Sequence, residues 1–186
     1  MADVAAAGVD AATGPHRMHR AESVLAAVGL GSNLDDPAAQ LRRAFDEISK
    51  LSGTMVLARS PLYRSTAVGP DGQSVPQPDF CNAAVLLETR LSPRSLLDAL
   101  QALEAAHGRD PQRRWVARSL DLDLLVYGDR VLNQPGMTVP HPRMAGRNFV
   151  LYPLRDIAPQ LHIPNLGRVH ELAAQLDSRG LQPWRD

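Results

Sequence analysis

The stretch that most constrains this chain is RWVARSLDLDLLVY, residues 114–127. Its second half alternates polar and apolar residues, which is the pattern of a β-strand. Because side chains alternate between the two faces of a strand, Asp121 and Asp123 share one face, and the leucines between and beside them point to the other and can pack. The two carboxylates have Cα atoms roughly 7 Å apart and repel each other unless a positive charge lies between them.

The carboxylate pair has two interpretations. One is an ordinary amphipathic strand whose polar face is wet. The other is a Mg²⁺ site, because Mg²⁺ takes one or two protein carboxylates and completes its shell with water and phosphate oxygens. Four arginines precede the strand closely and are offset only by Asp110; they are Arg109, Arg113, Arg114 and Arg118. A solvated basic loop would look similar, but arginines beside carboxylate-bound cations are also the parts of a phosphoryl-transfer site.

Length and composition restrict the class of protein. The chain has 186 residues, 44% of them hydrophobic and 22% charged, and a formal net charge of zero. These values predict one globular domain over residues 23–186, with residues 1–22 as a disordered tail that is not a secretory signal. They give no support to a nucleic-acid or membrane partner. The lone Cys81 excludes an intrachain disulfide, which is typical of a reducing, cytoplasmic protein.

Periodicity and capping residues predict alternating strands and helices. We expect strands over 23–28, 54–60, 80–89 and 120–127, and helices beginning at Pro37 and Pro93 and over 144–158 and 168–176. A small-residue turn is expected at 29–33 and a short return strand at 130–132. The mixture predicts an α+β fold with a layered, mixed or antiparallel sheet.

Two loops draw attention. Residues 64–79 are rich in proline and glycine and form either a functional lid or a tolerated surface insertion. In residues 138–142, His141 lies between two prolines, which suits a rigid phosphate donor as well as a structural histidine.

A binding site for a flat heterocycle is one interpretation of the aromatic residues in this chain. Phe80 and Asn82 share a strand face, and Phe149 is a second ring in a chain with 4% aromatic content. Rings stack on a heterocycle and an amide hydrogen-bonds its edge, but from these residues alone core packing is the favoured interpretation of both phenylalanines. The GSN sequence at 31–33 is neither a Walker loop nor a GxGxxG fingerprint, and a strand-to-helix turn accounts for it.

Taken together, these motifs resemble the 6-hydroxymethyl-7,8-dihydropterin pyrophosphokinase family. The matching segments occur in the family's order; they are Gly31-Ser32-Asn33, Tyr63-Arg64-Ser65, residues 78–84, Arg118 to Leu125, residues 138–142, and Phe149 to Leu151 followed by Pro153-Leu154. Five ordered motifs besides the signature strand make the resemblance more specific than any one of them.

The resemblance implies a ferredoxin-like α+β fold with helices on both faces of the sheet. It also implies a monomer acting on small molecules, which transfers the diphosphoryl group of ATP to the pterin hydroxymethyl oxygen in tetrahydrofolate synthesis. Two Mg²⁺ ions would be held by Asp121 and Asp123, with Arg109 and Arg118 positioning phosphates. The positions implied for ATP are Gln101, Glu104, Arg114, Trp115, Leu124, Thr138, His141 and Arg147; those implied for pterin are Ser65, Val68, Phe80, Asn82 and Phe149.

The chain departs from the family pattern before the signature strand, where Val116-Ala117 replaces the usual Gly-Pro. A non-catalytic nucleotide-binding module with the same scaffold therefore stays open as an alternative. A metal-dependent glycosyltransferase using Asp-x-Asp is disfavoured, because it leaves the other motifs unexplained.

Overall fold

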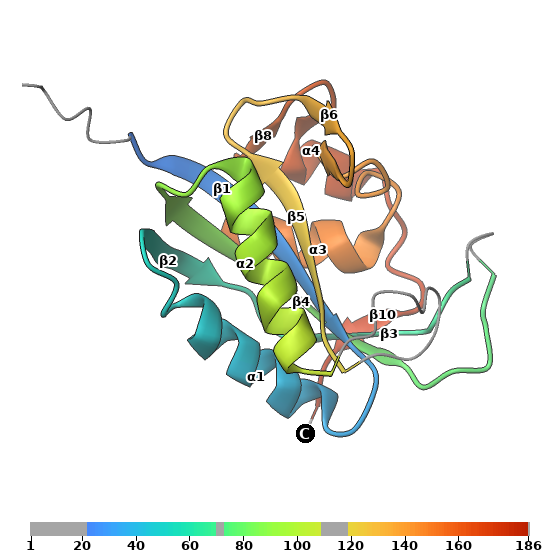
Figure 1. Cartoon of the computed structure of the whole chain (residues 1–186). Helices are drawn as coiled ribbons and strands as arrows, with labels where there is room; N and C mark the ends of the chain where they lie inside the picture. The colour runs from blue at the N-terminus through green and yellow to red at the C-terminus, as the bar shows by residue number, and fades with distance from the viewer. Residues whose placement is uncertain (1–21, 70–72, 109–118, 186) are drawn as a thin grey trace, which may run out of the picture.

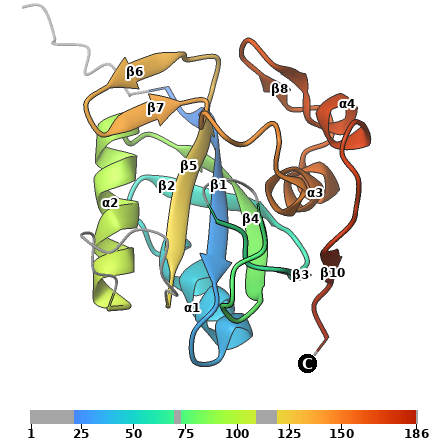
Figure 2. The same ribbon diagram turned by 90° about the vertical axis from the view of Figure 1, so that its right-hand side faces the viewer.

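The computed structural model describes residues 22–69, 73–108 and 119–185, and Figures 1 and 2 show two views of it. Its main feature is a six-stranded sheet in the order β10-β3-β4-β1-β5, with β2 also paired to β4. The strands of this sheet are β1 (Val24–Ser32), β2 (Thr54–Arg59), β3 (Tyr63–Ser65), β4 (Phe80–Thr89), β5 (Asp121–Tyr127) and β10 (Leu181–Pro183). Every pairing in it is antiparallel.

Helices cover both faces of the sheet, as Figure 2 shows most clearly. On one face lie α1 (Pro37–Ile48) and α2 (Pro93–Ala106), and on the other α3 (Asn148–Ile157) and α4 (Val169–Ala174). Each face has its own apolar cluster, with Phe45 and Leu100 in the first and Leu151 and Leu154 in the second. The α+β, ferredoxin-like arrangement with helices on both faces is therefore confirmed.

The first two helices begin where their caps predict. The Asp36 side chain accepts a hydrogen bond from the Ala39 N–H, and Pro37 takes the first helical position. Ser92 caps α2 in the same way, again followed by a proline. The predicted apolar faces point to the core, since Leu41, Ile48 and Leu96 are fully buried.

The expected turn at 29–33 was wrong, because β1 continues through Gly29, Gly31 and Ser32. Small residues are tolerated there since β1 is hydrogen-bonded on both sides, to β4 and to β5. The chain turns only afterwards, where Asp35 has a φ of 51°.

The return strand predicted at 130–132 was also misplaced. The structure instead has a separate hairpin of β6 (Leu132–Gln134) and β7 (Met137–Val139), which turns at Gly136 with a φ of 74°. Positive φ favours glycine at that position. The predicted rigid loop at 138–142 therefore begins as the end of a strand.

The short elements in the last third of the chain were predicted only in part: the sequence predicts an extended segment near residues 161–163, where the structure has a two-residue strand. The helix expected over 144–158 is shorter, and Pro153 lies within it. The pair β8 (His162–Ile163) and β9 (Gly167–Arg168) and the strand β10 are two or three residues long, too short to show a periodicity. The long loop predicted from residue 64 begins one strand later, since Tyr63–Ser65 form β3.

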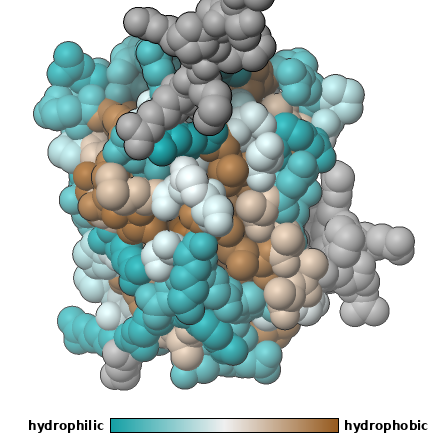
Figure 3. Space-filling view, turned by 60° about the vertical axis from the view of Figure 1, so that its left-hand side comes forward, coloured by the Kyte–Doolittle hydropathy of each residue, from teal (hydrophilic) through white to brown (hydrophobic). Residues whose placement is uncertain are grey.

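The described surface carries some apolar side chains. Met55 and Leu57 on the outer face of β2 are exposed. Figure 3, which brings the left-hand side of Figure 1 forward, shows apolar and polar areas mixed on that face. Among the described residues, no helix is long and apolar enough to cross a membrane. The predicted tail, apart from Glu22, lies outside the described residues.

Candidate active site

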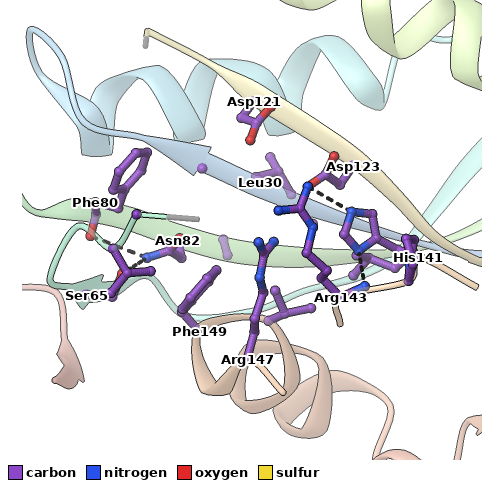
Figure 4. A pocket seen from close by; sticks show the side chains of 18 of the residues that line it. Leu30, Ser65, Phe80, Asn82, Asp121, Asp123, His141, Arg143, Arg147 and Phe149 are labelled. Atoms are coloured by element: carbon purple, nitrogen blue, oxygen red, sulfur yellow. Dashed lines mark hydrogen bonds and ion pairs between the residues drawn. The ribbon is translucent and has the colours of Figure 1, made fainter. Parts of the chain in front are cut away.

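A cleft of about 670 Å³ opens between the sheet and the N-terminal end of α3. Strands β1, β4 and β5 form its floor, and its walls come from segments 65–69, 75–77, 136–143 and 147–150. Figure 4 shows Asp121 and Asp123 at one end of the cleft and Ser65, Phe80 and Asn82 at the other.

The carboxylate end is built on β5, where the predicted alternation holds. Asp121 and Asp123 line the cleft, whereas Leu122 and Leu124 are buried in the core on the opposite face. Asp121 lies opposite Gly31 and Asp123 opposite Gly29 in the sheet, so no side chain of β1 stands between the carboxylates and the cleft. The arrangement offers hard oxygen ligands on a rigid strand.

This donor set fits Mg²⁺ in particular. Among residues 22–69, 73–108 and 119–185, no group of three or more His, Cys, Asp or Glu side chains is placed to hold a metal ion. Mg²⁺ needs no such group, because it usually binds through one or two carboxylates and keeps water and substrate phosphates as its other ligands.

His141 lies beside the carboxylates. Its backbone N–H donates to the carbonyl of Leu125, 2.9 Å away, which fixes the loop against the outer edge of β5. Its Nδ1 accepts from the Arg143 N–H at 3.3 Å, and its Nε2 is 3.9 Å from Asp123 Oδ2. Burial lowers the pKa of His141 despite the nearby Asp123 charge, which favours the neutral ring. Because Nδ1 accepts a hydrogen bond, the neutral ring carries its proton on Nε2 and can donate it into the cleft.

The opposite end combines a ring with an oriented amide. Asn82 is buried on β4, and its Nδ2 donates to Ser65 Oγ at 2.9 Å and to the Phe80 carbonyl at 3.4 Å. Both donors of the amide face these partners, so Oδ1 is the atom that Asn82 presents towards Gly31 and the cleft floor.

The start of α3 forms the side of the cleft that faces the sheet. Phe149 lies in the first turn of this helix and lines the cleft, and the guanidinium of Arg147 lies 5.5 Å from the centre of its ring. Figure 4 shows both side chains projecting from α3 towards the sheet, with Arg147 on the side of the carboxylates. A ring on α3 and a ring on β4 thus border one cleft.

The structure brings most of the predicted residues together. Those that line the cleft are Ser65, Val68, Phe80, Asn82, Asp121, Asp123, Thr138, His141, Arg147 and Phe149. Four predicted residues, Arg109, Arg114, Trp115 and Arg118, lie outside the described part of the chain.

Three predicted positions are described but do not line the cleft. Gln101 is exposed on α2, and Leu124 belongs to the core. Glu104 is 4% exposed, and its Oε1 accepts a 2.6 Å hydrogen bond from the N–H of Leu122. Leu122 is the residue between the two cleft aspartates in the sequence.

Sequence reasoning missed Gly31 and Arg143 as cleft residues. Gly31 was noticed as part of a motif but was assigned to a turn, whereas it lies on the floor. Arg143 follows the rigid loop of His141, and Figure 4 shows its side chain extending beside Asp123. Its position two residues after His141 was the available signal.

Fold and cleft together define a class of protein: an α+β protein whose open cleft places an aromatic and amide end next to a carboxylate pair suited to Mg²⁺ and phosphate. Residues 27–159 match the family model described as 7,8-dihydro-6-hydroxymethylpterin-pyrophosphokinase (HPPK). The chain belongs to this family.

Curated relatives agree with the match. The 2-amino-4-hydroxy-6-hydroxymethyldihydropteridine pyrophosphokinase of Pseudomonas aeruginosa is 44% identical over 155 residues, covering 83% of this chain and 93% of that protein. The enzymes of the same name from Haemophilus influenzae and Bacillus subtilis are 43% and 33% identical, and cover 82% and 87% of this chain and 92% and 90% of their own.

Solved structures with the same fold include wild-type HPPK-DHPS of Plasmodium falciparum, with a TM-score of 0.65 at 14% identity. The match covers 85% of this chain and 45% of the longer Plasmodium chain. A variant of that protein crystallised with pteroate gives a TM-score of 0.67 at 13% identity, covering 89% of this chain and 47% of that one. At these identities the likeness extends to the fold alone.

Proposed function

We propose that the cleft is the active site in which this chain carries out the reaction of its family. The chain is a diphosphotransferase of folate biosynthesis, which moves the pyrophosphoryl group of ATP to the hydroxymethyl group of 6-hydroxymethyl-7,8-dihydropterin. The observation that carries this assignment is that one cleft has Asp121 and Asp123 at one end and Phe80 and Asn82 at the other. These two ends suit the two substrates.

At the pterin end, the heterocycle is expected to stack between Phe80 and Phe149. The Asn82 Oδ1 accepts a hydrogen bond from a ring N–H or the amino group, because Ser65 and the Phe80 carbonyl hold the amide in that orientation. Val68 contributes apolar contact at the rim.

At the phosphate end, Asp121 and Asp123 would hold two Mg²⁺ ions. When bound, Mg²⁺ neutralises phosphate charge and helps to align attacking and leaving oxygens. Thr138, His141 and Arg147 line this side and contact the nucleotide, with His141 donating from Nε2. The family resemblance also implies ATP contacts for Arg114 and Trp115, and Arg109 and Arg118 would position the phosphates. The other ATP positions that it implies, Gln101, Glu104 and Leu124, do not line this cleft.

Positioning and charge neutralisation account for most of the catalysis in this scheme, and no general base is assigned. A protein that acts as a monomer is sufficient for it, since both ends of the cleft belong to one chain.

The decisive experiment follows the nucleotide product of the purified chain with ATP, Mg²⁺ and 6-hydroxymethyl-7,8-dihydropterin. Release of AMP in step with pterin diphosphate is expected. ADP instead of AMP would contradict diphosphoryl transfer, and nucleotide binding with no product would identify a non-catalytic binding module.

A further inference from the structure

Gly31 lies where the two ends of the cleft meet. In the sheet it is opposite Asn82 on β4 and opposite Asp121 on β5. A Cβ atom at Gly31 would lie 3.8 Å from Asn82 Oδ1, 3.9 Å from Asp121 Cβ and 3.9 Å from Phe80 Cδ1. The missing side chain therefore leaves a space bordered by the Cβ atom of Asp121, the amide oxygen of Asn82 and the ring of Phe80.

The backbone does not explain the glycine. Gly31 lies within β1, where its extended conformation suits any residue, and it is absent from the positions with positive φ. The three contacts that a Cβ would make are ordinary van der Waals distances. Glycine inside a strand is less stable than alanine, so the fold alone would favour alanine here.

The proposed reaction supplies a reason for the space. The hydroxymethyl group must lie between the pterin ring, held near Asn82 and Phe80, and the phosphates, held near Asp121. We propose that Gly31 is a specificity-determining residue, whose missing side chain leaves room on the cleft floor for the hydroxymethyl group of the acceptor. This inference rests on the proposed function of the cleft.

The test compares two ligands on the variant Gly31→Ala. Affinity is measured calorimetrically with a non-hydrolysable ATP analogue and Mg²⁺ present, for 6-hydroxymethyl-7,8-dihydropterin and for 7,8-dihydropterin, which lacks the substituent. A methyl group in a filled space costs about 1–3 kcal/mol, so roughly tenfold or greater weakening is expected for the hydroxymethyl compound. The unsubstituted ring is expected to bind the variant within about twofold of wild type, because it leaves that space unfilled.

A matched control is Gly146→Ala, because a Cβ there has no atom within 4 Å. It is expected to change neither affinity. Equal weakening of both ligands by Gly31→Ala would overturn the inference, since the methyl group would then disturb the ring slot. Unchanged affinity for both would overturn it as well.

The wild-type chain offers a second measurement that does not depend on the folding of a variant. A dihydropterin with a 1-hydroxyethyl group in place of hydroxymethyl places its extra methyl in the same space, and roughly tenfold weaker binding is expected. Equal binding of the two compounds would contradict a confined floor. Failure of wild type to release AMP would instead refute the proposed function, so the two failures are distinguishable.

Discussion

At the scale of single residues, the two ends of the cleft depend on different interactions. Asp121 and Asp123 are proposed to bind cations through their negative charge, so their replacement should weaken cation binding. Asn82 acts by direction, because its amide is held by two hydrogen bonds that leave one acceptor facing the floor. Substitutions at the two ends should therefore fail in different ways.

Asp123→Asn tests the carboxylate end. The change keeps the shape of the side chain but removes its charge, and loss of one metal ligand should reduce AMP release by about 100-fold or more. Asp129→Asn is a matched control, since Asp129 lies exposed in the turn after the same strand. Near-normal AMP release by Asp123→Asn, with thermal stability like that of wild type, would refute the proposed metal site.

Asn82→Ala tests the ring end. Loss of a directed acceptor typically costs about 1–3 kcal/mol, so pterin should bind roughly 10- to 100-fold more weakly in equilibrium titration. Affinity for an ATP analogue with Mg²⁺ should stay within about twofold, because Asn82 lies at the other end of the cleft. Equal weakening of both ligands would contradict the division of the cleft.

At the scale of elements, β5 is notable as an edge strand that carries the carboxylates. Its inner edge pairs with β1, and within the described part of the chain its outer edge pairs with no strand of the main sheet. Two other groups partly satisfy that outer edge: Glu104 accepts from the Leu122 N–H, and the His141 N–H donates to the Leu125 carbonyl. Helix α2 and the His141 loop therefore supply hydrogen bonds to β5 where a neighbouring strand would otherwise supply them.

Glu104→Leu should destabilise the protein by about 1–3 kcal/mol in chemical denaturation, because it leaves the Leu122 N–H without its acceptor. Glu104→Gln keeps an acceptor oxygen and should lose much less. Gln101→Leu, on an exposed position of the same helix, is the control for replacing a polar residue on α2 by leucine. If the leucine and glutamine variants of Glu104 were equally stable, this hydrogen bond would not support β5.

At the scale of the whole molecule, a side-chain hydrogen bond joins the sheet to the helix layer on one of its faces. The hydroxyl of Tyr63, on β3, donates to Asp156 Oδ2 near the end of α3. Burial and this hydrogen bond raise the pKa of Tyr63 to about 12. Both β3 and α3 border the cleft, through Ser65 and Phe149.

The raised pKa predicts a loss of stability in alkali. The folded state holds the phenolic proton up to a pKa of about 12, whereas the unfolded chain releases it near its ordinary value of about 10. This contribution is therefore fully present below pH 10 and disappears as the pH rises towards 12. Urea unfolding between pH 9 and about 12 should show a steeper decline for wild type than for Tyr63→Phe. Parallel curves would mean that the bond does not contribute.

Much of this architecture was predictable where local rules operate. Asp36 and Ser92 mark the starts of α1 and α2, the span of β4 follows from its apolar run, and the alternation around Asp121 assigns its face. Within the cleft, the predicted pairing of Phe80 and Asn82 on one strand with Phe149 elsewhere also agrees with their positions.

The rest depended on tertiary contacts that no local pattern carries. Gly29 and Gly31 look like a turn in the sequence, but pairing with β4 and β5 on both sides keeps them extended. Strand β10 is defined by its pairing with β3 and has no pattern of its own. Glu104 resembles any polar helical residue until the fold places it against β5.

The central position of β4 has a consequence for how the substrate is received. This strand is paired along one edge with β1 and along the other with β2 and β3, so its amides should exchange with deuterium only in the rarest openings of the molecule. Asn82 and Phe80 belong to this slowest-exchanging strand. The part of the cleft floor that we propose recognises the ring is therefore expected to be ordered before the ligand arrives, so that little of the binding energy is consumed in arranging it.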